Sequence, residues 1–276
     1  SPRPWCGAGN DRYLIDSTVD VVAETASTGT MDVVISAIDN TLTRYANVEA
    51  LVLQRNSTAW YGEGTIGNDI LVGNERDNYL VGDSGNDTLS GVADYGNVLE
   101  AQSDALDGGA GNDAMVAFDF GVFYSTTREV SLFGGSGNDL YVLGASQGHY
   151  GGLDASGTDT AVMTSSGSIA NLEGVENVYL WGADAAWDAA ARNAIDAVHG
   201  AFEGGAYTGN IGNAYDATGN DIANRITGNA LDNHLTGGAG NDTLVGAAGA
   251  EGQVVVQRVA RDAVGDVVAG GVVGVA

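Results

Sequence analysis

The chain has 276 residues, of which 43 are glycine, 36 are acidic and 10 are basic, giving a formal net charge of −26. Every basic residue is arginine, so little positive charge is available to neutralise nucleic-acid phosphates or an anionic membrane surface. The single cysteine, Cys6, permits no internal disulfide, and no apolar stretch is long enough to span a bilayer. The charge favours binding of a hard cation instead.

The first half of the chain combines a strand-rich spacer with a glycine-rich array. A degenerate frame at Cys6 contributes Asp11, and residues 12–61 then alternate in the manner of short strands. Residues 62–116 repeat with a period of nine, in frames that begin at Gly64, Gly73 and Gly82. An aliphatic residue fills position eight of each frame. We interpret residues 6–133 as a first module.

The second half repeats this organisation. A frame that begins at Gly134 leads into a spacer over 144–182, and a second array covers 219–246. The spacers are related, because Asp32 to Glu49 and Asp159 to Glu176 are both separated by 17 residues. We interpret 134–246 as a second module of the same kind.

An insertion over 183–205 distinguishes the second module. Apolar residues there step by 4, 4, 3 and 4 residues, which predicts one face of a helix near 184–202: Trp187, Ala191, Ile195, Val198 and Phe202. Asp184 is the expected N-cap, and Gly200 or Gly204 the expected end. The apolar stripe either packs on the wall or end of the repeat structure or docks a partner, and we favour the first interpretation.

The composition changes abruptly at residue 247. Residues 247–276 contain ten valines and no Asn, Ser, Thr, Leu or Tyr. This atypical tail is either an uncleaved secretion signal or an out-of-frame or truncated end, and we expect the chain to be a fragment of a longer protein.

The turns of the arrays carry the candidate ligands. Three of them match G-G-x-G-x-D in full, at 108–113, 134–139 and 237–242. Glycines at positions one, two and four allow positive φ, and two frames close a coil of 18 residues. Asp69 and Asp87 should therefore stack at the strand spacing of about 4.8 Å. Stacked carboxylates repel unless a cation lies between them, and oxygen-only ligands suit Ca²⁺ better than zinc or copper.

The best candidate site is the edge formed by Asp69 and Asp87, followed by Asp113, Asp139, Asp242 and Asp11. The turn backbone would contribute around Gly64, Gly67, Gly82, Gly85, Gly108, Gly111, Gly134, Gly137, Gly237 and Gly240. Edges where Asn78, Asn224 or Asn233 replaces the carboxylate should bind weakly or not at all, and Glu251 is marginal. We expect Glu49 and Glu176 to lie on solvent faces of strands.

These frames resemble the glycine-rich nonapeptide G-G-x-G-x-D-x-U-x of bacterial RTX (repeats-in-toxin) proteins. The resemblance implies an all-β fold, a right-handed parallel β-roll or β-solenoid with one short helical insertion, ordered by Ca²⁺. It also implies type I secretion and folding outside the cell. Two alternatives are an accessory module of an extracellular protease, lipase or polysaccharide epimerase, and an adhesin segment that binds glycans or surfaces, with Trp60, Tyr61, Trp181 and Trp187 as the candidate contact residues.

No catalytic constellation is visible. The strings 144–148 and 82–85 imitate serine-nucleophile motifs without the required context, and no H-E-x-x-H is present. We expect His149, His199 and His234 to be solvated, and we expect no enzyme.

Overall fold

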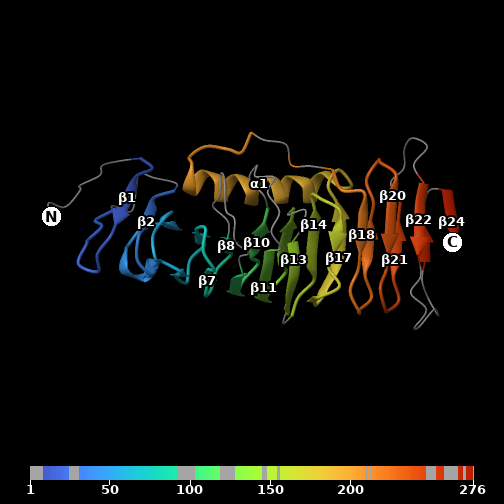
Figure 1. Cartoon of the computed structure of the whole chain (residues 1–276), viewed down its shortest axis with the longest axis horizontal. Helices are drawn as coiled ribbons and strands as arrows, with labels where there is room; N and C mark the ends of the chain where they lie inside the picture. Colours follow the sequence, from blue (N-terminus) through green and yellow to red (C-terminus); the bar gives the residue numbers. More distant parts are fainter. Residues whose placement is uncertain are drawn as a thin grey trace.

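The computed structural model describes residues 9–24, 31–91, 103–118, 128–144, 148–153, 156–208, 211, 213–246, 253–257, 267–269 and 272–275. The described chain winds into an elongated roll in which every strand pairs in parallel with the strands of neighbouring coils (Figure 1). The predicted parallel β-roll is therefore confirmed. Within the described residues, no helix has the length and apolarity needed to cross a membrane.

One sheet runs along the whole roll, and two shorter sheets share the opposite side. The long sheet has 12 strands in the order β1 (Arg12–Ile15), β2 (Val33–Ser36), β4 (Ala50–Leu53), β6 (Ile70–Val72), β8 (Thr88–Ser90), β10 (Ala114–Ala117), β12 (Leu140–Leu143), β14 (Asp159–Met163), β17 (Val175–Leu180), β19 (Arg225–Thr227), β21 (Thr243–Val245) and β23 (Val267–Ala269). The 7-stranded sheet contains β16 (Leu172–Glu173), β13 (Gly148–Leu153), β11 (Arg128–Ser136), β9 (Ser103–Ala110), β7 (Tyr79–Val81), β5 (Tyr61–Glu63) and β3 (Asn40–Thr41). The 5-stranded sheet contains β15 (Gly167–Ser168), β18 (Asp216–Thr218), β20 (Asn233–Thr236), β22 (Gln253–Gln257) and β24 (Val272–Val275), and a short 3-10 helix spans Leu42–Arg44.

The interior of the roll is filled by the residue at position eight of each frame. Leu71, Leu80 and Leu89 are each 0% exposed, and they join one hydrophobic core that continues through the spacers. This follows from strand geometry, because the central residue of a three-residue strand points inward while its neighbours point outward. The spacers thus extend the roll, and the tail contributes β22 and β24 to the 5-stranded sheet and β23 to the C-terminal end of the long sheet.

The predicted helix is α1 (Ala185–Phe202), and Figure 1 shows it lying along the roll. Asp184 caps it by accepting hydrogen bonds from the backbone N–H groups of Ala186 and Trp187. The helix continues through Gly200, and Gly204 lies beyond its end with φ +87°.

Helix α1 packs its apolar stripe on the outer face of the long sheet, across β4, β6, β8, β10, β12 and β14. Ile195 and Val198 are each 0% exposed and contact a second hydrophobic core that includes Val72, Val116 and Val142. The interpretation of the helix as packing on the wall of the roll is confirmed, and the long sheet is buried on both faces where the helix crosses it.

Candidate metal-binding edge

A column of acidic residues, interrupted by one asparagine, runs along one edge of the long sheet, and we call it the acidic edge. Its members stand directly before the strands of that sheet, or at the first position of β14 and the second of β17: Asp11, Asp32, Glu49, Asp69, Asp87, Asp113, Asp139, Asp159, Glu176, Asn224 and Asp242. The backbone N–H of Asp69 donates to Asp87 Oδ1 at 2.8 Å, that of Asp87 to Asp113 Oδ1 at 2.7 Å, and that of Asp113 to Asp139 Oδ1 at 2.7 Å. Each carboxylate is thus held against the next coil.

The stacking of Asp69 on Asp87 confirms the predicted coil of 18 residues. The partners of Asp113 and Asp139 could not be assigned from the repeat period, because their coils are longer. The contacts joining Asp87 to Asp113 and Asp113 to Asp139 each span 26 residues of sequence. The structure therefore places Asp87, Asp113 and Asp139 on three consecutive coils.

The expectation for Glu49 and Glu176 was wrong. Both continue the acidic edge, because Glu49 Oε2 accepts the N–H of Asp32 and Glu176 Oε2 accepts the N–H of Asp159, each at 2.8 Å. Sequence reasoning also missed Asp32 and Asp159, whose carboxylates accept the N–H groups of Asp11 and Asp139. The repeated 17-residue spacing of these acidic residues was the signal that could have found them.

Asp87 has a buried carboxylate oxygen that no donor of the described residues reaches. It is 1% exposed, and within the part of the chain that the structure describes no hydrogen bond reaches its Oδ2 atom. Burial raises the pKa of Asp87 to about 8, and the charges of Asp113 and Asp69 add to the rise although the N–H of Asp69 opposes it. Such a group needs a proton or a cation, and its surroundings of carboxylate and carbonyl oxygens suit calcium.

Asp69 has a similar position but a different environment. Burial raises its pKa as well, whereas hydrogen bonds from the backbone N–H and the hydroxyl of Thr65 to its Oδ2 lower it. The two carboxylates of the best predicted site are therefore not equivalent.

Glycine is required at the first position of these turns because a Cβ there would lie too close to neighbouring atoms, and not because of its φ. A Cβ on Gly64 would lie 2.8 Å from Asp69 Oδ2 and 2.6 Å from the carbonyl oxygen of Gly82. At Gly108 the corresponding distances are 2.5 Å to Asp113 Oδ2 and 2.7 Å to the Gly134 carbonyl, and Gly82 is confined in the same way; a Cβ on Gly237 would overlap Asp242 Oδ2. Positive φ was predicted at position one, but it occurs at positions two and four, as at Gly109 and Gly111.

The opposite edge of the roll holds fewer carboxylates. The N–H of Asn78 donates to Asp104 Oδ1 at 3.0 Å, and Asp104 is 2% exposed. Asp104 was not predicted, because residues 92–102 separate it from Gly91, the glycine that its carboxylate covers. Asn233 occupies the matching turn position in the second array.

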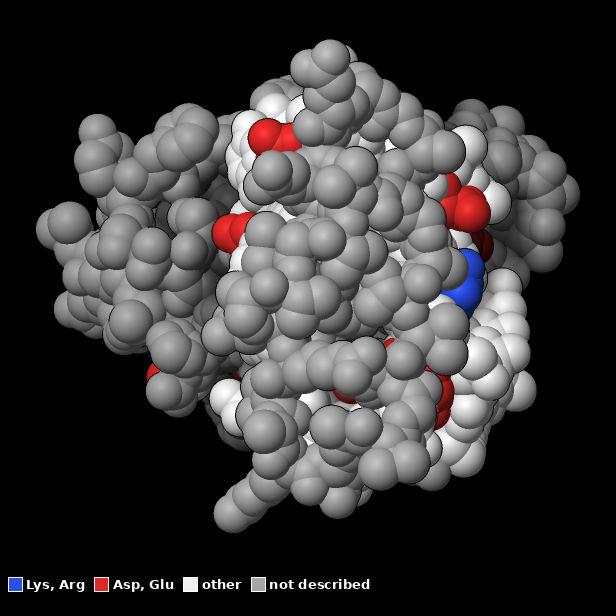
Figure 2. All heavy atoms as spheres, turned by 90° about the vertical axis from the view of Figure 1, so that its right-hand side faces the viewer, with Lys and Arg blue, Asp and Glu red and all other residues white. Residues whose placement is uncertain are grey.

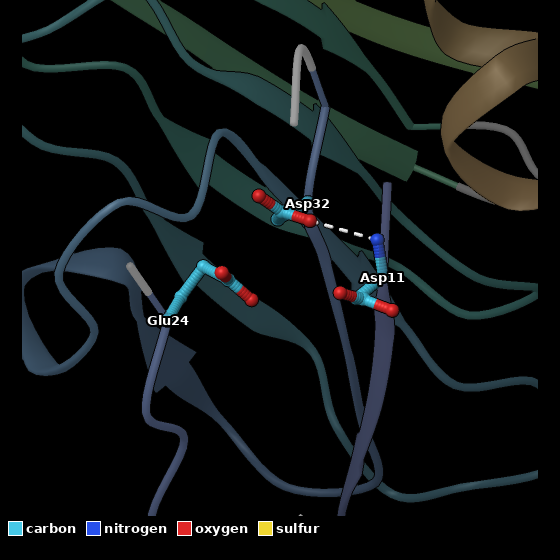
Figure 3. A group of neighbouring side chains, drawn as sticks. All are labelled: Asp11, Glu24 and Asp32. Carbon is cyan, nitrogen blue, oxygen red and sulfur yellow. Dashed lines mark hydrogen bonds between the residues drawn. The ribbon is translucent and has the colours of Figure 1, made fainter. Parts of the chain in front are cut away.

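The N-terminal end of the acidic edge gathers a third carboxylate. Figure 3 shows the carboxyl groups of Asp11, Glu24 and Asp32 turned toward one another, and one oxygen of each lies within 4.8 Å of the others. Burial raises the pKa of Asp32, and the charges of Glu24 and Glu49 add to it. Asp11 as a metal ligand stays a prediction, and Glu24 is a neighbour that the sequence did not reveal.

At the C-terminal end, the N–H of Asn224 donates to Asp242 Oδ1 at 2.9 Å, so Asp242 stacks on an amide. Glu251 and Cys6 lie outside the described residues. Figure 2 views this end of the molecule, where described acidic atoms reach the surface in several places.

Comparison with known families agrees with this geometry. The RTX calcium-binding nonapeptide repeat matches in four copies, at residues 63–96, 100–117, 127–146 and 218–250. These four segments are therefore RTX calcium-binding nonapeptide repeats. No curated protein and no solved structure matches the chain.

Proposed function

We propose that this chain is the calcium-dependent repeat region of a secreted bacterial protein, exported by a type I system and folding when it meets Ca²⁺ outside the cell. The observation that carries the proposal is the buried Oδ2 of Asp87, which accepts no hydrogen bond from the described residues, in a column of stacked carboxylates. Bound calcium would supply the positive charge that this column lacks.

The residues that would hold the ion are the carboxylates of Asp87, Asp113 and Asp139 with the carbonyl groups of their turns. Without it, the stacked carboxylates and a net charge of −26 oppose compaction. Extracellular modules bind calcium with dissociation constants of about 10⁻⁴ to 10⁻³ M, so such sites fill outside the cell and stay empty inside it. Coupling folding to export follows from that difference.

The test is a Ca²⁺ titration of chelator-treated protein followed by far-ultraviolet circular dichroism, with Mg²⁺ as the ion control. We expect a cooperative gain of β structure in Ca²⁺ alone. Asp87→Asn should raise the midpoint, whereas Asp221→Asn, which removes the same charge from an exposed turn position, should leave it unchanged. A complete β spectrum in excess chelator that Ca²⁺ does not alter would refute the proposal.

A second candidate is glycan adhesion, and one observation favours it. Trp60 is 51% exposed and Tyr79 is 37% exposed, with Tyr61 between them at ring-centroid distances of 6.0 and 5.9 Å. Trp181 and Trp187, also suspected from the sequence, instead pack against the core beneath α1. A glycan array with the wild-type chain and Trp60→Ala tests this candidate, which fails if no glycan binds. An accessory role beside an extracellular enzyme, with no catalytic group in this chain, stays a prediction.

A further inference from the structure

Eight glycine-rich turns of the two modules fall into two conformational classes. In four turns the residues at positions two and four both have left-handed φ, and we call these open turns: 82–87, 108–113, 134–139 and 237–242. Their position-two values are +75° at Asp83, +96° at Gly109, +98° at Gly135 and +93° at Gly238. In the other four, neither position has left-handed φ, and we call these capped turns: 64–69, 73–78, 219–224 and 228–233.

A side chain at position two closes each capped turn. Its oxygen accepts the backbone N–H of position four, at 3.0 Å for Thr65, 3.0 Å for Asn74, 3.2 Å for Asn220 and 3.0 Å for Asn229. This local hydrogen bond is the kind by which Ser, Thr and Asn side chains stabilise turns. It holds the turn without glycine's left-handed backbone.

In three of the four capped turns, the capping residue also donates to the position-six side chain; in the fourth, turn 228–233, no hydrogen bond from the described residues reaches Asn233 Oδ1. The N–H of Thr65 donates to Asp69 Oδ2 at 2.5 Å, and the N–H groups of Asn74 and Asn220 donate to Asn78 Oδ1 and Asn224 Oδ1 at 2.6 and 2.9 Å. In the open turn of Asp87, by contrast, no hydrogen bond from the described residues reaches Oδ2. An oxygen already held by a donor is a poorer cation ligand.

In the three asparagine turns, side-chain amides donate to backbone carbonyls that precede the array. The position-two Nδ2 donates to two such carbonyls in each turn. Asn74 reaches Gln54 and Ala59 at 3.3 and 2.8 Å, Asn220 reaches Leu172 and Val175 at 2.9 and 3.0 Å, and Asn229 reaches Trp181 and Ala214, both at 2.9 Å. The position-six Nδ2 then donates to the position-two Oδ1 at 3.2, 2.9 and 3.0 Å. These amides are buried, so each pair links the array to its spacer with no charge left to neutralise.

We propose that the residue at position two determines which turns take calcium, so that capped turns bind none and join the arrays to their spacers without the ion. The cation sites then lie between the three consecutive open turns, in the Asp87–Asp113 and Asp113–Asp139 gaps, and not at Asp69. The inference rests on the proposed calcium function. The family match covers open and capped turns alike, and so does not distinguish them.

The test compares two isosteric variants that remove the same charge from equivalent turn positions. Calcium binding to the chelator-treated full chain is measured by isothermal titration calorimetry. We expect Asp113→Asn to weaken binding at least about tenfold and to lower the stoichiometry, because it takes a carboxylate from both gaps. Asp69→Asn should change the affinity less than about twofold, since its donors from Thr65 remain.

A gain of function gives the converse test. The combined changes Asn220→Gly, Ile222→Gly and Asn224→Asp rewrite the capped turn 219–224 as an open one, stacked on Asp242. We expect one additional bound calcium ion. Equal losses in Asp69→Asn and Asp113→Asn, or an unchanged stoichiometry in the rewritten turn, would overturn the inference. A wild-type chain that binds no calcium would overturn the proposed function instead, so the two failures are distinguishable.

Discussion

Substitution of two glycines at the same motif position by alanine should change the stability of the fold by very different amounts. Gly111 and Gly67 both stand at position four of their turns. Gly111 has φ +150°, and an added Cβ would overlap the carbonyl oxygen of Gly85 one coil away. Gly67 is not left-handed, and the nearest atom to an added Cβ is the Thr65 hydroxyl oxygen at 3.3 Å. Alanine should therefore be tolerated at residue 67 and not at residue 111.

The size of the difference follows from these contacts. The strained φ costs about 1–3 kcal/mol at Gly111→Ala. Moving the coils apart weakens the hydrogen bonds from Gly111 N–H to Ser136 O and from Gly85 N–H to Ala110 O, both 2.8 Å and each contributing about 1 kcal/mol. The reduced freedom of the unfolded chain returns about 0.4–1 kcal/mol in both variants. We expect a net loss of about 2–4 kcal/mol for Gly111→Ala and a change within about 1 kcal/mol for Gly67→Ala.

Thermal unfolding in millimolar Ca²⁺, followed by circular dichroism, measures this difference. A chain of this size loses about 2–4 °C in Tm per kcal/mol, so Gly111→Ala should melt about 5–15 °C lower than wild type. Gly67→Ala should melt within about 3 °C of it. Similar losses in both variants would refute the division of the turns into two backbone classes.

Three further predictions concern the core, the helix and the ion-free state. Leu89→Ala should cost about 2–5 kcal/mol in urea unfolding because Leu89 is 0% exposed, whereas Ile66→Ala, at 89% exposure, should cost less than about 0.5 kcal/mol. Ile195→Ala should cost about 2–5 kcal/mol and Asp184→Ala about 1 kcal/mol, and both should reduce the helical signal first. In excess chelator, the pKa of Asp87 is raised from its ordinary 3.8 to about 8 in the folded chain. Protonation of the Asp87 carboxylate therefore stabilises the folded chain relative to the unfolded chain. The ion-free fold should therefore gain β structure as the pH falls from about 8 toward 4, with a smaller gain in Asp87→Asn, and a loss of β structure over that range contradicts the reasoning.

The periodic features of the fold could be predicted from the sequence, because each follows from one local rule. The nine-residue period gave the coil, the aliphatic residue at position eight gave the interior, and the steps between Trp187 and Phe202 gave the helix. The coil lengths outside the arrays were not predictable in this way. Asp104 belongs to a turn that begins at Gly91, and the residues between them hide the repeat from a search at fixed spacing.

The turn classes could not be predicted from the motif because they depend on a hydrogen bond between positions two and four. Asp69 and Asp87 are identical in the motif and stand one coil apart, yet only Asp69 has a neighbour, Thr65, whose side chain donates to it. The motif records residue types at fixed positions, whereas the difference lies in backbone conformation. Asp83 has a left-handed φ of +75°, and Thr65 does not have a left-handed φ.

The sequence held a signal for the place where the helix packs. It lies at positions seven and nine of the nine-residue frames, the outward-facing positions of the strands in the long sheet. These outward-facing residues are apolar on four of the strands that α1 contacts, β4, β6, β10 and β12, as in the pairs Ile70 and Val72, and Leu140 and Val142, although β8 has Thr88 and Ser90 there. Beyond the helix the same positions hold Arg225 and Thr227. Outward apolar residues on a strand otherwise exposed to water indicate that another element covers them.

Helix α1 packs on the same coils that carry the candidate calcium sites. Through these coils, the helical insertion of the second module contacts strands of the first module. Helix α1 contacts strands β6, β8, β10 and β12, whose acidic edge carries Asp69, Asp87, Asp113 and Asp139. The helix can bury Ile195 and Val198 only when these strands lie in register, and stacked carboxylates oppose that register until their charge is neutralised. Since a ligand that binds only the ordered coils stabilises every contact that requires them, calcium bound at the acidic edge would favour docking of α1, and docking of α1 would favour calcium binding, without contact between the two. On this reasoning, the helical insertion would make ordering of the central coils more cooperative than stacking of repeats alone.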